Sequence, residues 1–313
     1  MSATSRPKPR LAFTCGDPAG IGPQAVVLAL RSKAVRRACQ PVVVGEWSVW
    51  KRAGWTEALA PLVDTGLGLK PPAFGRVSKA AGQASFAAVR LAVRLAARGQ
   101  VEGVVTAPIS KEAWKRAGVR FPDHTEYLRK ESGREVEMVL GAPAQKLWCV
   151  PATRHIPLAK VSASLNVPRV LAAARSLSGA LKLLLGRRPK LGLCAFNPHA
   201  GESGILGGEE SRVLRPAALA ARKHGVDLSD PIPADTAWRR HVEGKLDGLV
   251  TLYHDQALIP LKTAAGLAIV NWTVGLAFPR TSPGHGTGFD LAGRSKPDPS
   301  ATIEAALLAA RLV

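Results

Sequence analysis

The sequence of 313 residues has few aromatic side chains, few methionines and few acids. Aromatic residues make up 5% of the chain, there are 2 methionines, and 23 acidic residues stand against 43 Lys and Arg residues, a formal net charge of +20 at pH 7. So low an aromatic content argues against a surface on which the bases of single-stranded nucleic acids stack. The basic residues are spread along predicted helices and no nucleic-acid-reading motif accompanies them, so nucleic acid is not the expected partner.

Four other sequence signals are missing. No apolar run is long enough to span a bilayer, and the basic N-terminus has no apolar segment behind it, so we expect neither a membrane span nor a signal peptide. The 4 cysteines form no C-x-x-C pair, which is typical of reduced core thiols in a cytoplasmic protein. The G-x-G-x-x-G fingerprint of many dinucleotide sites does not occur.

Short apolar runs rich in Val, Leu and Ile alternate with helix-like segments. This alternation predicts an α/β fold with mostly parallel strands covered on both faces. The predicted strands are 10–15, 41–45, 101–106, 146–152, 190–196, 246–253 and 267–273. The predicted helices are 24–37, 80–97, 169–185, 209–224, 234–245 and 299–312. Ligands of such sheets gather at the carboxyl ends of the strands, where we therefore look for functional residues.

Three histidines follow three of these strands. They are His155, His199 and His254. Each alone is more often a hydrogen-bonded, half-buried residue than a ligand, but the ends of parallel strands lie along one edge, so the three imidazoles can converge. Neutral imidazoles suit a divalent ion such as Zn, Co or Mn, and three protein ligands with open positions are typical of a catalytic metal site.

Other strand ends leave two readings open. The glycine-rich turn GDPAGIGP could present backbone amides to a ligand or could be structural alone. His124, after a Pro-Asp turn, could be a cap or a ligand contact. Arg280 could bind a phosphate together with Lys262 and Asn271, or could be a salt-bridged loop residue. Two further histidines in helix-like segments, His224 and His241, are predicted to be solvated.

Eight segments in order resemble one known family. They are GDPAGIGP, VTAPISKEAW, DHTEYL, TRHIPL, NPHAGESG, PADTAW, YHDQALIPLK and FPRTSPGHGTGFDLAG. Together they resemble the 4-hydroxythreonine-4-phosphate dehydrogenase family of vitamin B6 biosynthesis. The resemblance implies the two-domain α/β fold of isocitrate and isopropylmalate dehydrogenases, with an interdomain cleft and a homodimer. It implies a basic tail over 1–10 and two interleaved catalytic domains over 11–313, with crossings near 125–150 and 260–280.

The resemblance also implies roles for particular residues. One divalent ion per site (Zn, Co, Mn or Mg) would be held by the three strand-end histidines, some of them contributed by the partner subunit. Substrate contacts would come from His124, Thr125, Lys262, Asn271 and Arg280. NAD or NADP would lie on His285, Gly286 and Thr287. Two departures from the family pattern, Gly284 where Asp is usual and Arg154 where a small polar residue is common, lie beside these sites.

The implied reaction is the metal-dependent oxidation and decarboxylation of 4-hydroxythreonine 4-phosphate by NAD(P). Asp235 and Asp255 are candidates for the base or for orienting the histidines. One alternative is a related dehydrogenase for a phosphorylated erythronate or threonate, or for a dihydrodiol carboxylate without phosphate. A second alternative, a basic nucleic-acid-binding protein on an inactive enzyme fold, has no need of three metal-ligating histidines.

Overall fold

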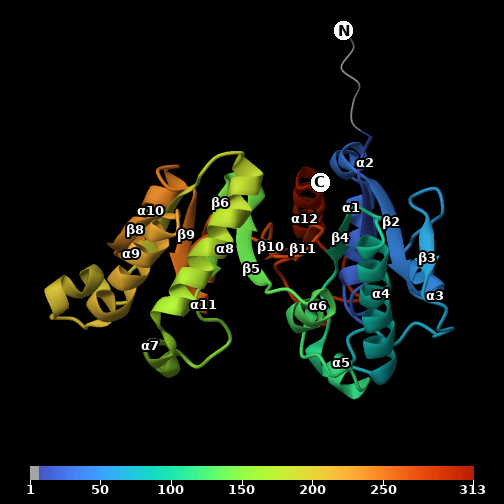
Figure 1. Ribbon diagram of the computed structural model, residues 1–313. Helices are drawn as coiled ribbons and strands as arrows, with labels where there is room; N and C mark the ends of the chain where they lie inside the picture. The colour runs from blue at the N-terminus through green and yellow to red at the C-terminus, as the bar shows by residue number, and fades with distance from the viewer. Residues whose placement is uncertain (1–6) are drawn as a thin grey trace, which may run out of the picture. The chain divides into compact units, whose positions relative to one another are not determined.

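The computed structural model describes residues 7–313, which form two compact units (Figure 1). Unit 1 comprises Met1–Val136 and Val270–Val313, and unit 2 comprises Glu137–Ile269. The chain passes from unit 1 into unit 2 after Val136 and returns at Val270. Residues 1–6 of the expected N-terminal tail lie outside the described residues.

Unit 1 contains a mostly parallel sheet with strand order β3-β2-β1-β4-β11-β10. Its strands are β1 (Arg10–Thr14), β2 (Gln40–Gly45), β3 (Leu62–Asp64), β4 (Gly103–Thr106), β10 (Val270–Val274) and β11 (Arg280–Pro283). Neighbouring strands pair in parallel except β10 and β11, which are antiparallel. Strand β11 therefore lies between β4 and β10, with Arg280 at its first position.

The helices of unit 1 are α1 (Gly22–Arg31), α2 (Lys33–Ala38), α3 (Trp47–Arg52), α4 (Lys79–Ala97), α5 (Lys111–Arg116), α6 (His124–Ser132) and α12 (Ser300–Arg311). Helices α4 and α12 pack directly on the strands of this sheet. Alanines of the long helix α4 pack on Ala12, Val44 and Val104 of the sheet, and small side chains allow this close approach. The helix predicted over 24–37 is two helices, because Ser32 adopts an extended conformation and its side chain accepts a hydrogen bond from Ala34 N.

Unit 2 contains mostly parallel strands in the order β5-β6-β9-β7-β8. Its strands are β5 (Glu137–Ala142), β6 (Leu147–Pro151), β7 (Lys190–Cys194), β8 (Asp227–Ile232) and β9 (Gly248–Thr251). Strands β5 and β6 are antiparallel, and the other neighbours are parallel. The predicted strands that end in His155, His254 and His199 are thus the three adjacent parallel strands β6, β9 and β7.

The helices of unit 2 include four short non-α segments. The α-helices are α7 (Val161–Ser164), α8 (Val167–Leu185), α9 (Arg215–Lys223), α10 (Ala234–Val242) and α11 (His254–Ala265). The 3-10 segments are η1 (Pro143–Gln145), η2 (Leu158–Lys160) and η3 (Pro198–Gly204), and η4 (Glu210–Leu214) is a π-helical turn. Helix α8 begins after Asn166, which caps Arg169 N, and ends at Gly186, whose φ of 69° is costly for other residues.

One predicted surface residue is in fact buried. His241 is 3% exposed, and its Nε2 accepts a hydrogen bond from Trp148 N at 2.8 Å while Nδ1 lies 2.8 Å from the carbonyl oxygen of Leu246. The prediction that His241 is solvated is therefore wrong, because its ring packs inward on the backbone of Trp148 and Leu246 while the neighbouring Arg239 and Arg240 stay exposed. His224 is exposed, as predicted.

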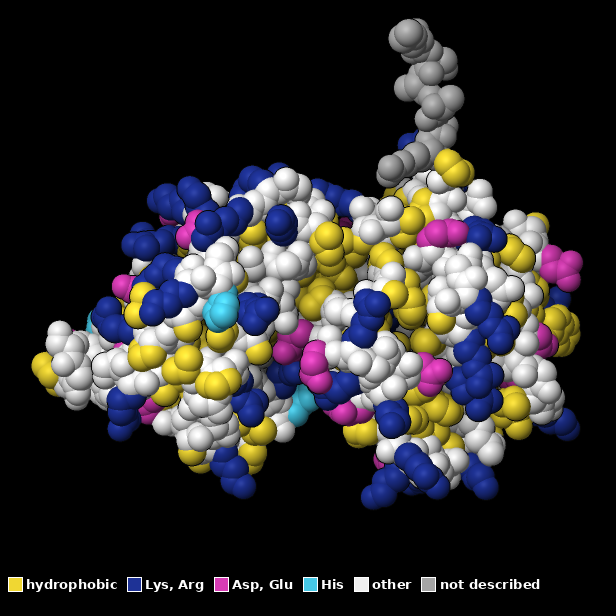
Figure 2. Space-filling model, in the orientation of Figure 1, with side chains coloured by type: hydrophobic (Ala, Val, Ile, Leu, Met, Phe, Trp, Pro, Cys, Tyr) yellow, Lys and Arg dark blue, Asp and Glu magenta, His cyan; other side chains and the backbone are white. Residues whose placement is uncertain are grey.

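Both units combine helices with mostly parallel sheets, which confirms the α/β fold class. No helix within residues 7–313 is long and apolar enough to cross a membrane. Lys and Arg side chains are scattered over both units on the face drawn in Figure 2, without one dense patch there.

Candidate active site

The histidines that follow β6 and β9 lie close together in unit 2. The ring centroids of His155 and His254 are 5.8 Å apart. His199 follows β7 in a turn where residues 199–203 all have positive φ, and its side chain is exposed. Within residues 7–313 no three His, Cys, Asp or Glu side chains lie close enough together to hold a metal ion. The structure therefore brings two of the three predicted ligands together.

His254, Asp255 and Gln256 begin helix α11 and have different partners. Asp255 Oδ1 lies 2.6 Å from Nδ1 of His254, which leaves Nε2 as the nitrogen available to a ligand. Gln256 accepts from Leu252 N at 2.7 Å and donates to the carbonyl oxygen of Ala195 at 2.8 Å, so it links the ends of β9 and β7. Gln256 is thus structural, and His254 with Asp255 remains available for chemistry.

Two consecutive glutamates hold the segment that carries His199. Glu210 Oε1 accepts from the backbone amides of Phe196 and Asn197 at 2.9 and 2.8 Å. The Asn197 side-chain amide donates to Glu210 Oε2 and to Glu209 Oε2, both at 2.9 Å. The π-helical turn that begins at Glu210 is an unusual backbone geometry of the kind often found near functional sites.

Glu209 also joins this segment to the one that follows His155. Its Oε1 accepts from the hydroxyl of Ser162 on α7 at 2.6 Å. Hydrogen bonds from Ser162 and Asn197 lower the pKa of Glu209 to about 2, so the carboxylate is ionised at neutral pH. Sequence reasoning missed both glutamates, because a Glu-Glu pair in a charged helix usually faces solvent.

Arg280 is the central residue of a polar group in unit 1. It is 3% exposed, and its guanidinium donates to Thr273 Oγ1 at 2.9 Å and to Thr106 Oγ1 at 2.5 Å. The two threonines belong to β10 and β4, the strands on either side of β11. Thr273 is directly opposite Arg280 in the register, and Asn271, two residues away, points to the same face.

Arg280 has no carboxylate partner among residues 7–313, and its Nε has no hydrogen-bond partner there. Burial lowers its pKa to about 10, still high enough to keep the cation at neutral pH. A buried cation held only by neutral hydroxyls keeps donor capacity for an anion. The reading of Arg280 as a salt-bridged loop residue is wrong, because the residue lies in a strand and forms no salt bridge within the described chain.

His124 is the first residue of α6 and lies near this cation. Its Nε2 is covered and has no partner within residues 7–313, and its ring contacts Trp114 edge to face with centroids 5.3 Å apart. Burial, then the cations of Arg280 and Lys111, lower its pKa well below the usual value, so the imidazole is neutral. The N-cap of α6 is the preceding residue, Asp123, and not His124.

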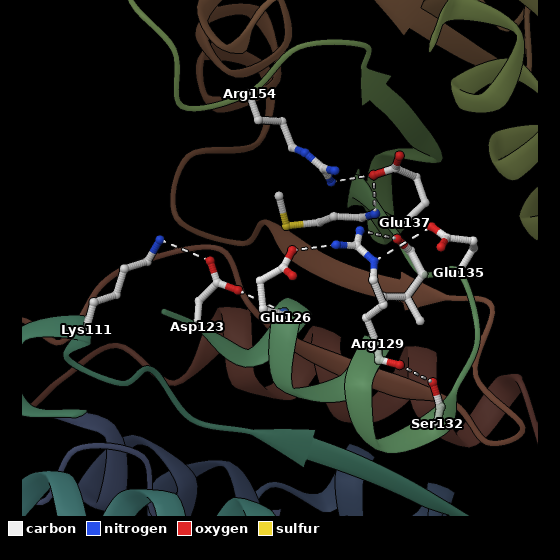
Figure 3. A network of polar contacts seen from close by, with 10 residues as sticks. Lys111, Asp123, Glu126, Arg129, Ser132, Glu135, Glu137 and Arg154 are labelled. Atoms are coloured by element: carbon white, nitrogen blue, oxygen red, sulfur yellow. Dashed lines mark hydrogen bonds and ion pairs between the residues drawn. The ribbon is translucent and has the colours of Figure 1, made fainter. Parts of the chain in front are cut away.

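Figure 3 shows how the start of α6 is fixed. Asp123 Oδ1 accepts from Glu126 N at 3.2 Å, and Lys111 reaches from α5 to Asp123 Oδ2 at 3.2 Å. Thr125 follows His124 in this first turn and is partly exposed. In unit 2 the same figure shows Arg154 paired with Glu137 at the start of β5. The unusual Arg154 beside His155 is therefore held by an acid of its own unit.

The glycine-rich turn uses its backbone amides inside unit 1. Asp17 N donates to Pro108 O at 2.8 Å, Ala19 N to Asp17 Oδ1 at 2.9 Å, and Ile21 N to Thr287 O at 2.9 Å. Gly20 approaches so closely that a Cβ there would lie 2.4 Å from the oxygen of Thr287. The structural reading of this turn is therefore favoured over an anion cradle.

This turn supports the segment in which the resemblance places the cofactor. His285 Nδ1 lies 2.9 Å from the carbonyl oxygen of Gly286, while its Nε2 is covered and has no partner within residues 7–313. An orphaned ring nitrogen of this kind fits a ligand that completes its hydrogen bond. The remaining predicted residues are exposed and belong to unit 2: Lys262 on α11, and Asp235 on α10, whose carboxylate has no partner among the described residues.

The described chain thus consists of two mostly parallel α/β units, with the buried Arg280 in unit 1 and the strand-end histidines in unit 2. A β-decarboxylating dehydrogenase of Thermococcus kodakarensis has the same fold, with a TM-score of 0.51 at 16% identity over 97% of this chain and 83% of that chain. The chain belongs to the family described as pyridoxal phosphate biosynthetic protein PdxA, which matches residues 24–309. This confirms the family that the sequence motifs indicate.

Relatives within the family carry more than one substrate name. A 4-hydroxythreonine-4-phosphate dehydrogenase of Geobacter metallireducens is 37% identical over 97% of this chain and 96% of its own. A protein of Oceanobacillus iheyensis named for D-threonate 4-phosphate dehydrogenase is 35% identical over 95% and 96%.

The names of similar solved structures also include more than one substrate. A 4-hydroxythreonine-4-phosphate dehydrogenase of Klebsiella pneumoniae has a TM-score of 0.84 at 35% identity, covering 97% of this chain and 100% of that chain. A terephthalate 1,2-cis-dihydrodiol dehydrogenase of Burkholderia xenovorans has a TM-score of 0.67 at 31% identity, covering 97% and 98%. Family membership thus leaves more than one substrate to consider.

Proposed function

We propose that this protein oxidises and decarboxylates 4-hydroxythreonine 4-phosphate in the biosynthesis of pyridoxal phosphate. The single observation that carries the choice of a phosphorylated substrate is Arg280, a buried cation whose hydrogen-bond partners among residues 7–313 are the hydroxyls of Thr106 and Thr273. A dihydrodiol carboxylate has no phosphate to match such a cation, whereas a terminal phosphate accepts its remaining N–H groups. We take units 1 and 2 to be the two interleaved catalytic domains.

Arg280, His124 and Asn271 form the phosphate end of the proposed site. The neutral His124 offers a hydrogen bond without adding a third positive charge beside Arg280 and Lys111. Thr125, in the same helical turn, and Lys262, exposed on α11, complete the proposed substrate contacts. Binding energy from the phosphate, far from the reacting carbon, positions the hydroxyl for oxidation.

We propose that His155, His199 and His254 are ligands of a divalent metal ion such as Zn, Co, Mn or Mg. The carboxylate of Asp255 on Nδ1 of His254 fixes the ring so that Nε2 can bind a metal, which is the usual arrangement for a ligating histidine. Bound there, the ion supplies Lewis acidity that lowers the pKa of the substrate hydroxyl and stabilises negative charge after loss of CO₂. We propose a homodimer in the cytoplasm whose partner subunit completes the set of three ligands.

The segment with His285, Gly286 and Thr287 is the proposed contact for the NAD or NADP that accepts the hydride. The unpartnered Nε2 of His285 supports a ligand there. Asp255 orients His254, so its oxygen is already engaged. The exposed Asp235 has a carboxylate without a partner within residues 7–313 and is the better candidate for the base that takes the hydroxyl proton.

A substrate panel tests this proposal. The purified protein is assayed for NADH and NADPH formation with added Zn, Co, Mn or Mg, using 4-hydroxythreonine 4-phosphate, threonate and erythronate 4-phosphates, and a dihydrodiol carboxylate. We expect the highest kcat/KM with 4-hydroxythreonine 4-phosphate. If a phosphorylated threonate is turned over much faster than 4-hydroxythreonine 4-phosphate, the protein is instead a related dehydrogenase for a phosphorylated threonate or erythronate. Turnover of the dihydrodiol alone would remove the role given to Arg280.

A further inference from the structure

A cavity of about 340 Å³ opens on unit 1 beside the glycine-rich turn. All its walls belong to unit 1: the turn with Pro18 and Gly20, the start of α1, helix α3, the ring of Phe74, and residues 293–296. Its volume lies at the lower end of the range of small-molecule sites in proteins. None of the residues given a role in the proposed reaction lines it.

The charge of this cavity is of one sign. Three cationic side chains line it, Arg52, Arg294 and Lys296, and no carboxylate does among the residues described around it. None of the three forms an ion pair with any residue of 7–313. Three like charges around one small cavity repel each other unless an anion enters.

Arg52 is held in place by neutral groups. Its guanidinium donates to the carbonyl oxygens of Pro18 and Pro72, both at 2.5 Å, and lies 4.1 Å from the centre of the Phe74 ring. These contacts fix its position and leave its charge uncompensated, and burial lowers its pKa. An arginine that is partly buried without an acid is a more specific feature than the many paired or solvated cations of this basic chain.

We propose that this cavity binds a small organic phosphate, with the phosphate on Arg294 and Lys296 and the carbon skeleton against Phe74 and Arg52. Charge-assisted hydrogen bonds from Lys and Arg are the usual recognition of phosphate. Phe74 and Val49 give the wall an apolar part that inorganic phosphate alone leaves uncovered. This site is additional to the proposed reaction and does not depend on it.

Calorimetric titration of the full-length protein tests the site, with inorganic phosphate, pyridoxal 5′-phosphate and pyridoxal as probes. Pyridoxal 5′-phosphate joins a phosphate to a flat ring and so matches both parts of the cavity. We expect pyridoxal 5′-phosphate to bind more tightly than inorganic phosphate. We expect pyridoxal to bind at least tenfold more weakly than pyridoxal 5′-phosphate. Equal binding of pyridoxal and its phosphate would overturn the proposal, because the cations would then contribute nothing.

The double variant Arg294→Gln/Lys296→Gln should weaken pyridoxal 5′-phosphate binding at least tenfold. Both side chains are exposed, so the fold should be unaffected. The matched control is Lys33→Gln, an exposed cation of unit 1 outside the cavity, which should leave binding unchanged. An unchanged isotherm in the double variant, or an equal loss in the control, would contradict the site.

Two further titrations separate this site from the others. Arg280→Lys should weaken phosphate binding at the proposed substrate site while leaving the signal that the double variant removes. NADH and NADPH should bind the double variant as they bind the wild type. If their affinity falls by the same factor as that of pyridoxal 5′-phosphate, the cavity belongs to the cofactor and the proposal of a separate site is wrong.

Discussion

The carboxylate of Glu210 fixes Asn197 through both its backbone amide and its side-chain amide. Glu210 is 3% exposed, so these hydrogen bonds are made away from water, where an unmatched donor is costly. Asn197 is the residue before Pro198, where the turn with His199 begins. The conformation of that turn therefore depends on the carboxylate of Glu210.

Replacing Glu210 by glutamine should loosen this turn. The glutamine oxygen can still accept from the backbone, but its NH₂ group would face the Asn197 NH₂ group, so we expect a loss of about 1–3 kcal/mol in the free energy of unfolding. Urea denaturation measures this loss, and calorimetry with Zn or Co should show weaker metal binding. The control is Glu202→Gln in the same turn, whose exposed side chain should change stability by less than about 0.5 kcal/mol.

The pair of hydrogen bonds that the Arg280 guanidinium donates to Thr106 and Thr273 is a second feature that mutation can test. In Arg280→Lys a point charge replaces two fixed N–H groups, so we expect KM for a phosphorylated substrate to rise roughly 30-fold, about 2 kcal/mol, with a smaller change in kcat. Steady-state kinetics measure both constants. Arg98→Lys, an exposed arginine at the end of α4, serves as the control. An unchanged KM in Arg280→Lys would show that the phosphate lies elsewhere.

The sequence pattern predicts seven of the described strands and misses β3, β5, β8 and β11. Strands β1, β2, β4, β6, β7, β9 and β10 contain runs of Val, Leu or Ile and are predicted to within a few residues. Strand β11 reads Arg-Thr-Ser-Pro and β8 contains two Asp and a Pro, so neither has a hydrophobic period. Strands β8 and β11 form because they pair with strands that are distant in the sequence, and no local pattern encodes that pairing.

The candidate site divides in the same way. The three strand-end histidines stand out in the sequence because polar residues follow an apolar run there. Arg280 stands out because it follows Pro279. Their supports do not stand out: Thr106 and Thr273 reach Arg280 only because β4 and β10 flank β11. Helix α11 was also hidden, since Pro260 suggests a break, yet the helix continues through it. Tertiary neighbours, which a single sequence does not give, decide these roles.

The pair of His254 and Asp255 leads to a test of the two aspartates. Asp255→Asn weakens the acceptor on Nδ1, so we expect metal affinity to fall roughly 10–100-fold. Asp235→Asn, at an exposed position without a partner in the described chain, should leave metal affinity unchanged and lower kcat if Asp235 is the base. Metal titration and kcat, measured for both variants, separate the two roles. Equal metal affinity in Asp255→Asn and wild type would contradict the orienting role of Asp255.

His241 should make stability depend on pH. Burial lowers its pKa in the folded state below the ordinary value of 6.5. Below pH 6.5 the unfolded chain then binds a proton that the folded chain does not, so the contribution of His241 falls as the pH falls, by at most about 1.4 kcal/mol per pH unit.

The variant His241→Gln isolates this effect. The stability advantage of the wild type over His241→Gln, measured by urea denaturation, should shrink between pH 7 and pH 5. His224→Gln, at an exposed position, should show no such trend. A constant difference for His241→Gln across this range would mean that the histidine titrates alike in both states.

Asp17 should make stability depend on pH in the opposite direction to His241. It is fully buried, its Oδ2 has no partner within residues 7–313, and burial raises its pKa to about 6 from 3.8. Between these two values the folded chain binds the proton that the unfolded chain has lost. Stability therefore falls as the pH rises from about 4 to 6, by a total of about 2–3 kcal/mol.

Asp17→Asn removes this titration while the amide oxygen can still accept from Ala19 N. The free energy of unfolding of the wild type minus that of Asp17→Asn should therefore fall by about 2–3 kcal/mol between pH 4 and pH 7. Asp64→Asn, at an exposed aspartate of unit 1, should show little change over the same range. A flat difference for Asp17→Asn would mean that the buried carboxylate gains a partner that keeps it ionised, and a ligand bound beside the turn would be the first candidate to examine.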